Sequence, residues 1–247
     1  VFHLAAQTSH TYSMKNPGLD IDVNIKGIVN VLEAMKENIP DARLIYTSTK
    51  GVTGIPHSLP VNEETPTDPL DVYSANKLLA ENYCKIYNHH YNIEYSILRF
   101  TNIFGPRQQI SSPSLGILNF FIGQAMKDET ITIYGDGNQL RDYNYVENAI
   151  DALLLCATKE EAKNEIFYLG SNIGTKFKDM VSTIVEVVGK GNIKFVPYPT
   201  VAKKIEIGDF IVDYSKLRNS LGWEPKVSFR QGIEKTVDFY KNQSEHY

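Results

Sequence analysis

A tyrosine and a lysine four residues apart, Tyr73 and Lys77, are the side chains of this 247-residue sequence whose types and spacing best fit acid/base chemistry. They lie near the start of a stretch with helical periodicity, and residues four apart on a helix share one face, about one turn apart. A free phenol has a pKa of about 10, and a nearby cation favours its ionised form. The pair therefore predicts a proton-transferring tyrosine that shares a pocket with an ammonium group.

The same spacing occurs a second time in the chain, in Tyr46 and Lys50. This copy falls at the end of an apolar run that has the pattern of a strand, and residues four apart on a strand lie roughly 13 Å apart. An isolated pair of either kind is most often an ordinary pair of surface side chains. The sequence around each pair therefore has to decide between them.

The first part of the chain alternates between expected strands and expected helices. Alternation of this kind implies a parallel sheet with right-handed crossovers, and such sheets bind ligands at the carboxyl ends of their strands. The polar ends at residues 5–6, 47–49 and 101–102 would then line one edge of a doubly wound α/β sheet. The expected strands are residues 1–6, 43–47 and 94–100, and the expected helices are residues 22–38 and 70–90.

Shorter and more mixed elements are expected after Gly105, and we place a boundary there. Residues 1–105 would form the parallel-sheet part, and residues 106–247 a smaller mixed α/β part. The expected helices of this second part are residues 115–127, 146–158, 177–188, 215–221 and 229–242, and its expected strands are residues 131–134, 142–145, 166–169 and 193–196.

The composition is that of an ordinary globular protein and argues against several classes of partner. The net charge is -4 and the 25 Lys and Arg are scattered, so no nucleic-acid partner is expected. The sequence has no run of 18 apolar residues, so no membrane partner is expected. Its two cysteines, Cys84 and Cys156, have the spacing of neither a disulfide framework nor a zinc site, so we expect no metal and a cytoplasmic location.

Several separated segments are weak signals singly but form a specific combination in their order and spacing. They are His3-Leu-Ala-Ala6, Asn24-x-x-Gly27, Thr47-Ser-Thr49 with Gly54, Tyr73-x-x-x-Lys77, Arg99-Phe-Thr-Asn102 with Gly105-Pro-Arg107, Gly135-Asp-Gly-Asn-Gln-Leu-Arg-Asp142 and Leu221-Gly-Trp-Glu-Pro225. Together they resemble the extended short-chain dehydrogenase/reductase family, in particular its nucleotide-sugar epimerases and dehydratases of the UDP-glucose/galactose 4-epimerase type. The resemblance implies a Rossmann-type dinucleotide-binding part, residues 1–105, interleaved with a nucleotide-sugar-binding part, residues 106–247.

The resemblance also assigns roles to catalytic and cofactor-binding side chains. In this family the tyrosine is the acid/base at the reacting sugar carbon, the lysine binds the nicotinamide ribose and lowers the tyrosine pKa, and a Ser or Thr assists. These roles fall to Tyr73, Lys77 and Thr49. The implied cofactor is NAD, with NADP left open because the residue that chooses between them normally lies upstream. The implied cofactor-binding residues are Leu4, Ala5, Ala6, Asn24, Thr47, Tyr73, Lys77 and Phe100.

The implied substrate is a nucleotide-diphosphate sugar. By resemblance, Arg141 contacts the diphosphate, Asn102 the sugar-phosphate portion and Asp209 the nucleotide ribose, while Thr49 lies at the sugar. A guanidinium suits the first of these roles because it can bond a phosphate through two parallel hydrogen bonds.

Two positions depart from the family pattern. Galactose-epimerase-like members carry an arginine for the phosphates where this chain has Glu206, with Lys203 and Lys204 just upstream. Where Val-Tyr-Gly is usual, this chain has Thr53 between the Val and the Gly, which alters the expected pocket wall. The departures leave the nucleotide and the sugar unnamed.

The residues after Thr49 favour one reaction of the family. Its 4,6-dehydratases and related decarboxylases need an acidic side chain just after the Ser or Thr, because elimination requires a further acid/base. This chain has Lys50 and Gly51 there. We therefore expect an NAD-dependent epimerase that acts through a transient keto sugar by hydride transfer. A 4,6-dehydratase and an NADPH-dependent keto-sugar reductase stay open as alternatives, as does a non-catalytic nucleotide-binding homologue.

Two further expectations concern the upstream sequence and the assembly. The chain begins without Met on an apolar run and contains no Gly-x-Gly-x-x-Gly, so we expect the pyrophosphate-binding turn of the family to precede residue 1. The resemblance also implies a homodimer in which helices 22–38 and 70–90 of two copies form a four-helix interface.

Overall fold

The computed structural model describes residues 1–113, 116–198 and 207–243. The contacts among these residues divide the chain into two compact units, each assembled from separate stretches of sequence. The first unit comprises Val1–Thr101, Ile150–Leu169 and Asp213–Glu224, and the second comprises the described residues of Asn102–Ala149, Gly170–Val212 and Pro225–Tyr247.

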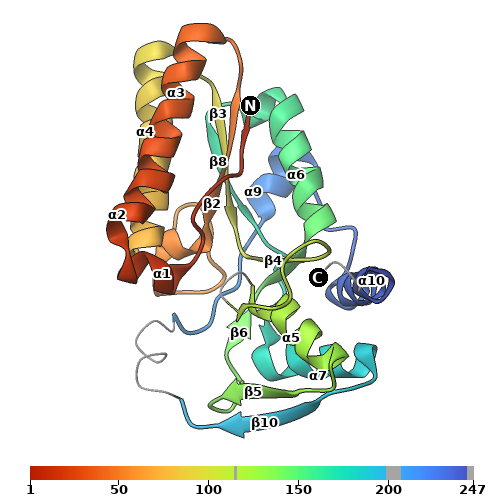
Figure 1. Cartoon of the computed structure of the whole chain (residues 1–247). Coiled ribbons are helices and arrows are strands. Elements are labelled where there is room, and N and C mark those ends of the chain that lie inside the picture. Colours follow the sequence, from red (N-terminus) through yellow and green to blue (C-terminus); the bar gives the residue numbers. More distant parts are fainter. Residues whose placement is uncertain (114–115, 199–206, 244–247) are drawn as a thin grey trace. The chain divides into compact units, whose positions relative to one another are not determined.

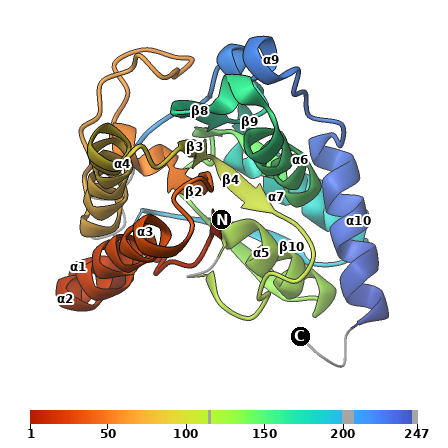
Figure 2. The ribbon, with the colours of Figure 1, turned by 90° about the horizontal axis from the view of Figure 1, so that it is seen from above.

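A parallel sheet forms the centre of the first unit. Its strand order is β1-β2-β3-β8, and each neighbouring pair is parallel. The strands are β1 (Phe2–His3), β2 (Leu44–Thr49), β3 (Tyr95–Phe100) and β8 (Glu165–Leu169). Helices α3 (Gly27–Asn38) and α4 (Val72–Tyr91) cover one face, and α9 (Ser215–Leu221) and the part of α6 (Val146–Thr158) that belongs to this unit cover the other (Figures 1 and 2). The prediction of a doubly wound α/β sheet is confirmed.

Apolar side chains of α3 and α4 bury one face of this sheet. Ile28 and Leu32 of α3 and Ala80 of α4 pack in one cluster with Leu44 of β2 and Ile97 of β3, and all five are fully buried. Burying an aliphatic side chain of this size stabilises a fold by about 1.5–3 kcal/mol. The cluster therefore fixes α4, the helix that carries Tyr73 and Lys77, against the strands.

Both ends of α4 are set by polar residues. The carboxylate of Asp71 accepts a hydrogen bond from the N–H of Ser74 at 2.8 Å and so caps the N-terminus. Asn92 ends the helix with φ at 58°, a left-handed conformation that asparagine tolerates better than most residues. The helix begins at Val72, which is two residues later than predicted and one residue before Tyr73.

The segment between β1 and α3 differs from the prediction. β1 covers only two residues of the expected strand 1–6, and helical structure begins well before residue 22. After His3 the backbone leaves the sheet, and the N–H of Gln7 bonds to the side chain of Asn24 in place of a neighbouring strand. The helices that were not predicted are α1 (His10–Lys15) and α2 (Pro17–Asp20). The predicted helix 22–38 is formed by the π-helical η1 (Ile21–Lys26), which continues into α3.

The second unit combines short strand pairs with amphipathic helices around a core that includes Phe104, Ile131 and Ile184. The prediction missed β4, β6 and β9, because strands of two or three residues are too short to show alternation. The parallel pairs are β5 (Thr130–Tyr134) with β10 (Asn192–Val196) and β4 (Asn102–Phe104) with β7 (Tyr143–Tyr145), and β6 (Leu140–Arg141) is antiparallel to β9 (Thr175–Lys176). The helices include α5 (Ile117–Met126), α7 (Phe177–Val188) and α10 (Phe229–Asn242).

Two observations concern the classes of partner considered from composition. No helix in the described ranges combines the length and apolar character needed to cross a membrane. Cys84 and Cys156 are both buried with free thiols.

The first unit also contains two short 3-10 turns, η2 (Lys50–Thr53) and η4 (Glu160–Ala162).

Candidate active site

Thr49 and Tyr73 meet at the carboxyl end of β2. Thr49 is the last residue of this strand, Tyr73 lies in the first turn of α4, and Lys77 follows one turn later. The hydroxyl of Thr49 is hydrogen-bonded to the phenol of Tyr73, and its oxygen accepts the N–H of Gly51 at 3.1 Å. The three side chains predicted to be catalytic all belong to the first unit and are buried. A phenol bonded to a hydroxyl in this arrangement can exchange a proton with a substrate oxygen.

Burial shifts the acid/base properties of Tyr73 and Lys77 in opposite directions. It raises the pKa of Tyr73 to about 12, an effect that the hydrogen bond from Thr49 partly offsets and nearby carboxylates reinforce. Burial also lowers the pKa of Lys77 to about 7, against the opposing effect of Glu81. The resemblance implies a lysine that lowers the tyrosine pKa, but in the chain itself the cost of burying a phenolate is larger. Tyr73 therefore needs further positive charge beside it to act as a base at neutral pH.

Tyr46, from the second copy of the Tyr/Lys spacing, supports the lysine of the first copy. The Lys77 ammonium lies 4.1 Å from the centroid of the Tyr46 ring, a cation–π contact. The ring is only 1% exposed, and its hydroxyl has no hydrogen-bond partner among the described residues. Burial holds the pKa of Tyr46 well above its usual value, so this phenol stays neutral. Tyr46 is thus a structural neighbour of the pair.

The loop after β1 is tied down by a buried carboxylate. Asp20 accepts hydrogen bonds from the side-chain amides of Gln7, Asn24 and Asn76, at 2.6, 3.0 and 2.7 Å. Asn24, a predicted cofactor-binding residue, also donates to the carbonyl of Gln7 at 3.0 Å. Both of its amide N–H groups are therefore used within the chain, so Asn24 can influence a cofactor by holding the loop in place.

The other predicted cofactor-binding residues follow the carboxyl-terminal halves of the strands. Leu4, Ala5 and Ala6 come directly after β1, and Leu4 is exposed. Thr47 lies in β2 and Phe100 ends β3, and both are half-buried. In the sheet register, Phe100 lies directly opposite Thr49. The structure thus brings these residues to one edge of the first unit's sheet.

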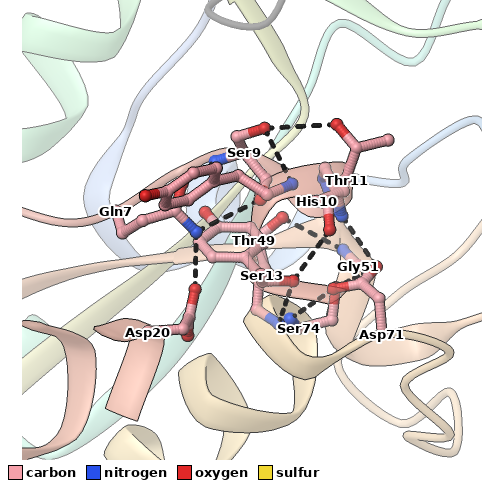
Figure 3. Close-up of polar contacts among 12 residues, drawn as sticks. Gln7, Ser9, His10, Thr11, Ser13, Asp20, Thr49, Gly51, Asp71 and Ser74 are labelled. Atoms are coloured by element: carbon pink, nitrogen blue, oxygen red, sulfur yellow. Dashed lines mark hydrogen bonds and ion pairs between the residues drawn. The ribbon is translucent and has the colours of Figure 1, made fainter. Parts of the chain in front are cut away.

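A further group of side chains around Tyr73 was not predicted. His10, from α1, pairs through Nδ1 with the Asp71 carboxylate at 2.7 Å (Figure 3). The His10 ring also packs edge-on against the Tyr73 ring. His10 and Asp71 are 61 positions apart. No local spacing could reveal their contact, although Asp71 three residues before Ser74 is a typical helix N-cap.

Below the site, a buried ion pair crosslinks α4 and the sheet. The guanidinium of Arg99 donates two hydrogen bonds to the carboxylate of Glu81, at 3.0 and 2.8 Å. The hydroxyl of Ser48 donates to the same carboxylate at 2.5 Å. All three residues are at most 5% exposed. Glu81 lies one helical turn after Lys77, and its negative charge favours the charged form of the lysine.

Thr53, the departure from the family's Val-Tyr-Gly, has a partner of its own. Its hydroxyl is hydrogen-bonded to the phenol of Tyr168, which lies in β8. The Arg99 guanidinium lies 5.3 Å from the centroid of the Tyr168 ring. The threonine is therefore joined to the buried polar network.

The predicted substrate-binding residues of the second unit are tied to its backbone. The side-chain amide of Asn102 donates to the carbonyl of Asp142 at 2.8 Å. Arg141 donates to the carbonyls of Leu140 and Gly208, and the Asp209 carboxylate accepts the N–H of Leu140 at 2.7 Å. Arg141 and Asp209 thus lie at one corner of this unit. Glu206, Lys203 and Lys204 lie outside the described residues.

Asp142 organises that corner of the second unit. Its carboxylate accepts the N–H and the hydroxyl of Ser171 at 2.7 and 2.8 Å, and the N–H of Val212 at 3.2 Å. Burial raises its pKa to about 6, although these donors favour the charged form. A Cβ on Gly170 would lie 2.7 Å from this carboxylate, so only glycine fits there. Asp142 therefore holds together the segments that carry Asn102, Arg141 and Asp209.

The parallel sheet, with a Thr–Tyr pair at the end of one strand and a lysine one helical turn further on, is the arrangement of an extended short-chain dehydrogenase/reductase. A model of the family described as GDP-mannose 4,6 dehydratase matches residues 1–236, and the chain belongs to this family of nucleotide-sugar epimerases and dehydratases. The resemblance drawn from the sequence segments is confirmed.

Named relatives and solved structures of the same family are similar to this chain. The chain is 34% identical to the putative UDP-glucose 4-epimerase of Methanocaldococcus jannaschii, over 99% of this chain and 77% of that protein. The UDP-glucose 4-epimerase of Thermotoga maritima, solved with UDP-glucose, is similar with a TM-score of 0.90 and 31% identity, over 99% of this chain and 77% of that one. The UDP-glucose 4-epimerase of Thermus thermophilus, solved with NAD, is similar with a TM-score of 0.87 and 30% identity, over 98% and 77%.

Proposed function

We propose that this protein is an NAD-dependent epimerase of nucleotide sugars that works through a transient keto sugar. The observation that carries the proposal is the hydrogen-bonded Thr49–Tyr73 pair at the end of β2, followed by Lys50 and Gly51 in place of a carboxylate. Relatives and solved neighbours named as UDP-glucose 4-epimerases support it. UDP-hexoses that differ at C4 are therefore the first substrates to test.

In the proposed reaction, Tyr73 exchanges a proton with a sugar hydroxyl. Its phenolic oxygen accepts the hydroxyl proton as the carbon is oxidised, and Thr49 hydrogen-bonds near the same oxygen. The proton returns when the carbon is reduced from the opposite face of the keto sugar. When bound, NAD supplies the redox chemistry by accepting and returning the hydride. We assign Lys77, one helical turn after Tyr73, to the nicotinamide ribose.

The first unit fits the nicotinamide half of NAD. Lys77 is 3% exposed and burial lowers its pKa, so hydrogen-bond acceptors such as ribose hydroxyls would stabilise its charged form. We assign the walls of this site to Leu4, Ala5, Ala6, Thr47 and Phe100, with Asn24 holding the first three in place through Gln7. The sequence contains no Gly-x-Gly-x-x-Gly, so the assignment concerns the nicotinamide and its ribose alone.

We assign the nucleotide diphosphate of the substrate to the second unit, through Asn102, Arg141 and Asp209. The guanidinium of Arg141 presents five N–H donors in a fork that matches phosphate oxygens. Asp209 and Arg141 are tied to neighbouring backbone groups, which supports a shared role. Equilibrium binding of free nucleoside diphosphates to the wild-type protein and to Arg141→Gln tests this assignment.

Product analysis with the full-length native protein tests the proposed reaction. Given NAD and a panel of UDP-, GDP-, CDP- and dTDP-hexoses, the protein should interconvert two C4 epimers of at least one of them. Deuterium placed at C4 should remain in the product, because the hydride returns to the carbon that it left. A dehydrated product would identify a 4,6-dehydratase, NADPH consumption a reductase, and binding without turnover a non-catalytic homologue.

We also propose a cytoplasmic homodimer that packs residues 22–38 and 70–90 of two copies together. Two buried free cysteines agree with a reducing compartment. Exposed apolar side chains on α4, at Leu79, Ile86 and Tyr91, favour a partner on that helix. Sedimentation equilibrium should give twice the chain mass for the native protein and a shift towards monomer for Ile86→Glu. A monomeric wild-type protein would exclude the dimer.

A further inference from the structure

A series of hydrogen bonds through His10, Ser13, Asp71 and Ser74 joins α1 to the start of α4 (Figure 3). The N–H of Tyr73 donates to the hydroxyl of Ser13 at 3.0 Å, and this hydroxyl donates to the carbonyl of His10 at 2.8 Å. His10 then bonds through Nδ1 to the Asp71 carboxylate at 2.7 Å. The same carboxylate accepts the N–H of Ser74 at 2.8 Å, so the series of hydrogen bonds ends at the residue after Tyr73.

The ring of His10 also packs directly on the tyrosine. The centroids of the His10 and Tyr73 rings are 4.9 Å apart, and the rings are nearly perpendicular at 81°. A Cβ on Gly51 would lie 3.4 Å from Cε1 of His10 and 2.3 Å from the Ser74 hydroxyl, so the glycine leaves room for this packing. With Thr49 bonded to the phenol, Tyr73 is held at its backbone N–H, its ring and its hydroxyl.

The hydrogen bond between His10 and Asp71 fixes which nitrogen of the imidazole faces the carboxylate. An ionised carboxylate can only accept hydrogen bonds, so Nδ1 of His10 carries a proton whether the ring is neutral or charged. Nε2 is then the nitrogen that does not bond to Asp71, and the side chain is 47% exposed to solvent. The bond to Asp71 therefore fixes how the imidazole faces the tyrosine.

The carboxylate in turn acts on the tyrosine. Burial raises the pKa of Asp71, but the hydrogen bond and charge of His10 outweigh this effect with help from Ser74, so the pKa of this carboxyl is below its usual value. Asp71 is therefore ionised at neutral pH, and its negative charge is among the causes that raise the pKa of Tyr73.

Other titratable groups of the first unit lie on the elements packed against α1. Among the described residues they are Asp71, Tyr73 and Lys77 at the start of α4, Asp20 at the end of α2 and Lys50 at the start of η2. Within α1 itself, Tyr12 and Lys15 are titratable. Of all these groups, the interactions described above join His10 directly to Asp71 and Tyr73.

We propose that His10 is a positioning residue for Tyr73: held by Asp71, it keeps the tyrosine ring in place beside Thr49. The inference rests on the proposed function in so far as Tyr73 is the acid/base. It predicts that His10 affects the chemical step and has little effect on the binding of either the cofactor or the nucleotide sugar.

Kinetics of three variants of the full-length protein test this role. His10→Leu removes the ring and the bond to Asp71, and should lower kcat about tenfold or more with both KM values within about twofold, because small misplacements of a catalytic group are costly. His10→Gln, whose amide can donate to Asp71 in place of Nδ1, should recover part of kcat. Asp71→Ser keeps a helix cap and should resemble His10→Leu.

A double-mutant comparison separates positioning from general stability. In a Tyr73→Phe background, His10→Leu should have little further effect on residual turnover, since the group that it positions is gone. Equal losses in both backgrounds, an unchanged kcat in His10→Leu, or a rise in both KM values with kcat intact would overturn the proposal. A thermal melt of each variant identifies any that has lost its fold, in which case His10→Gln alone carries the kinetic test.

A ligand-free measurement keeps this proposal distinct from the proposed function. With tyrosine rings isotopically labelled, the NMR signal of Tyr73 is the one lost in Tyr73→Phe. It should shift in His10→Leu and in Asp71→Ser, because the edge-on packing is lost or loosened. If the wild-type protein turns over no nucleotide sugar, the proposed function fails but this contact is still tested. An unmoved Tyr73 signal would overturn the positioning role even in an active epimerase.

Discussion

Replacing Tyr73 by Phe is expected to lower kcat about 100-fold or more, in line with the usual contribution of a positioned general acid/base. The substitution removes only the phenolic hydroxyl, which is bonded to Thr49 and carries the transferred proton in the proposed reaction. The ring keeps its packing against His10, with centroids 4.9 Å apart. The KM for the nucleotide sugar should therefore change little. Steady-state kinetics over a range of pH, with both constants determined, is the required measurement.

Tyr46→Phe is the matched control for this loss. It removes another buried phenolic hydroxyl, one with no hydrogen-bond partner among the described residues, and keeps the ring 4.1 Å from the Lys77 ammonium. Its kcat should stay within about twofold of the wild-type value, since no hydrogen bond is lost. Full activity in Tyr73→Phe, or equal losses in the two variants, would contradict the assignment of the acid/base to Tyr73.

Replacing Glu81 by Gln should lower the free energy of unfolding of the first unit by about 3–5 kcal/mol, because it leaves a buried charge without its partner. The guanidinium of Arg99 is bonded twice to Glu81, and the two residues are 5% and 0% exposed. Urea unfolding can be followed through Trp223, the single tryptophan of the chain, which is buried in the same unit.

Two further variants show whether burial is the reason for this loss. Arg218 and Glu224 form an exposed pair at 2.8 Å in the same unit, and Glu224→Gln should cost less than about 1 kcal/mol. Combining Glu81→Leu with Arg99→Met replaces both charges by apolar side chains and should recover much of the stability lost in Glu81→Gln. Similar effects for the buried and the exposed pair would mean that the network under the site contributes little.

The parts of the fold that could be predicted are those with strong local patterns. β2 and β3 show as apolar runs, and α4 and α10 as long periodic stretches. α1 could not be predicted because little in its own sequence favours a helix. It is held by partners such as the N–H of Tyr73, 60 positions away from Ser13. The short strand β4 likewise forms only because β7 lies beside it.

The candidate site divides in the same way. Thr49, Tyr73 and Lys77 could be found because their spacing and order match a family pattern, and the structure brings them into one unit. The contact of Tyr46 with Lys77 was not predicted, because the two copies of the spacing are alternatives in the sequence. In the structure, Tyr46 of β2 and Lys77 of α4 contact each other. The contact between His10 and Asp71 depends on tertiary packing alone.

The face of α4 that carries the candidate catalytic residues has an evolutionary consequence. Tyr73, Lys77 and Glu81 follow one another at four-residue intervals on a buried face, where apolar side chains would stabilise the helix more. Under the proposed function, the fold therefore gives up stability for chemistry along this line. Selection or design for thermal stability alone would favour apolar replacements there and would remove the candidate active site while improving the fold. A thermostable relative that retains all three polar residues must have gained its stability elsewhere in the molecule.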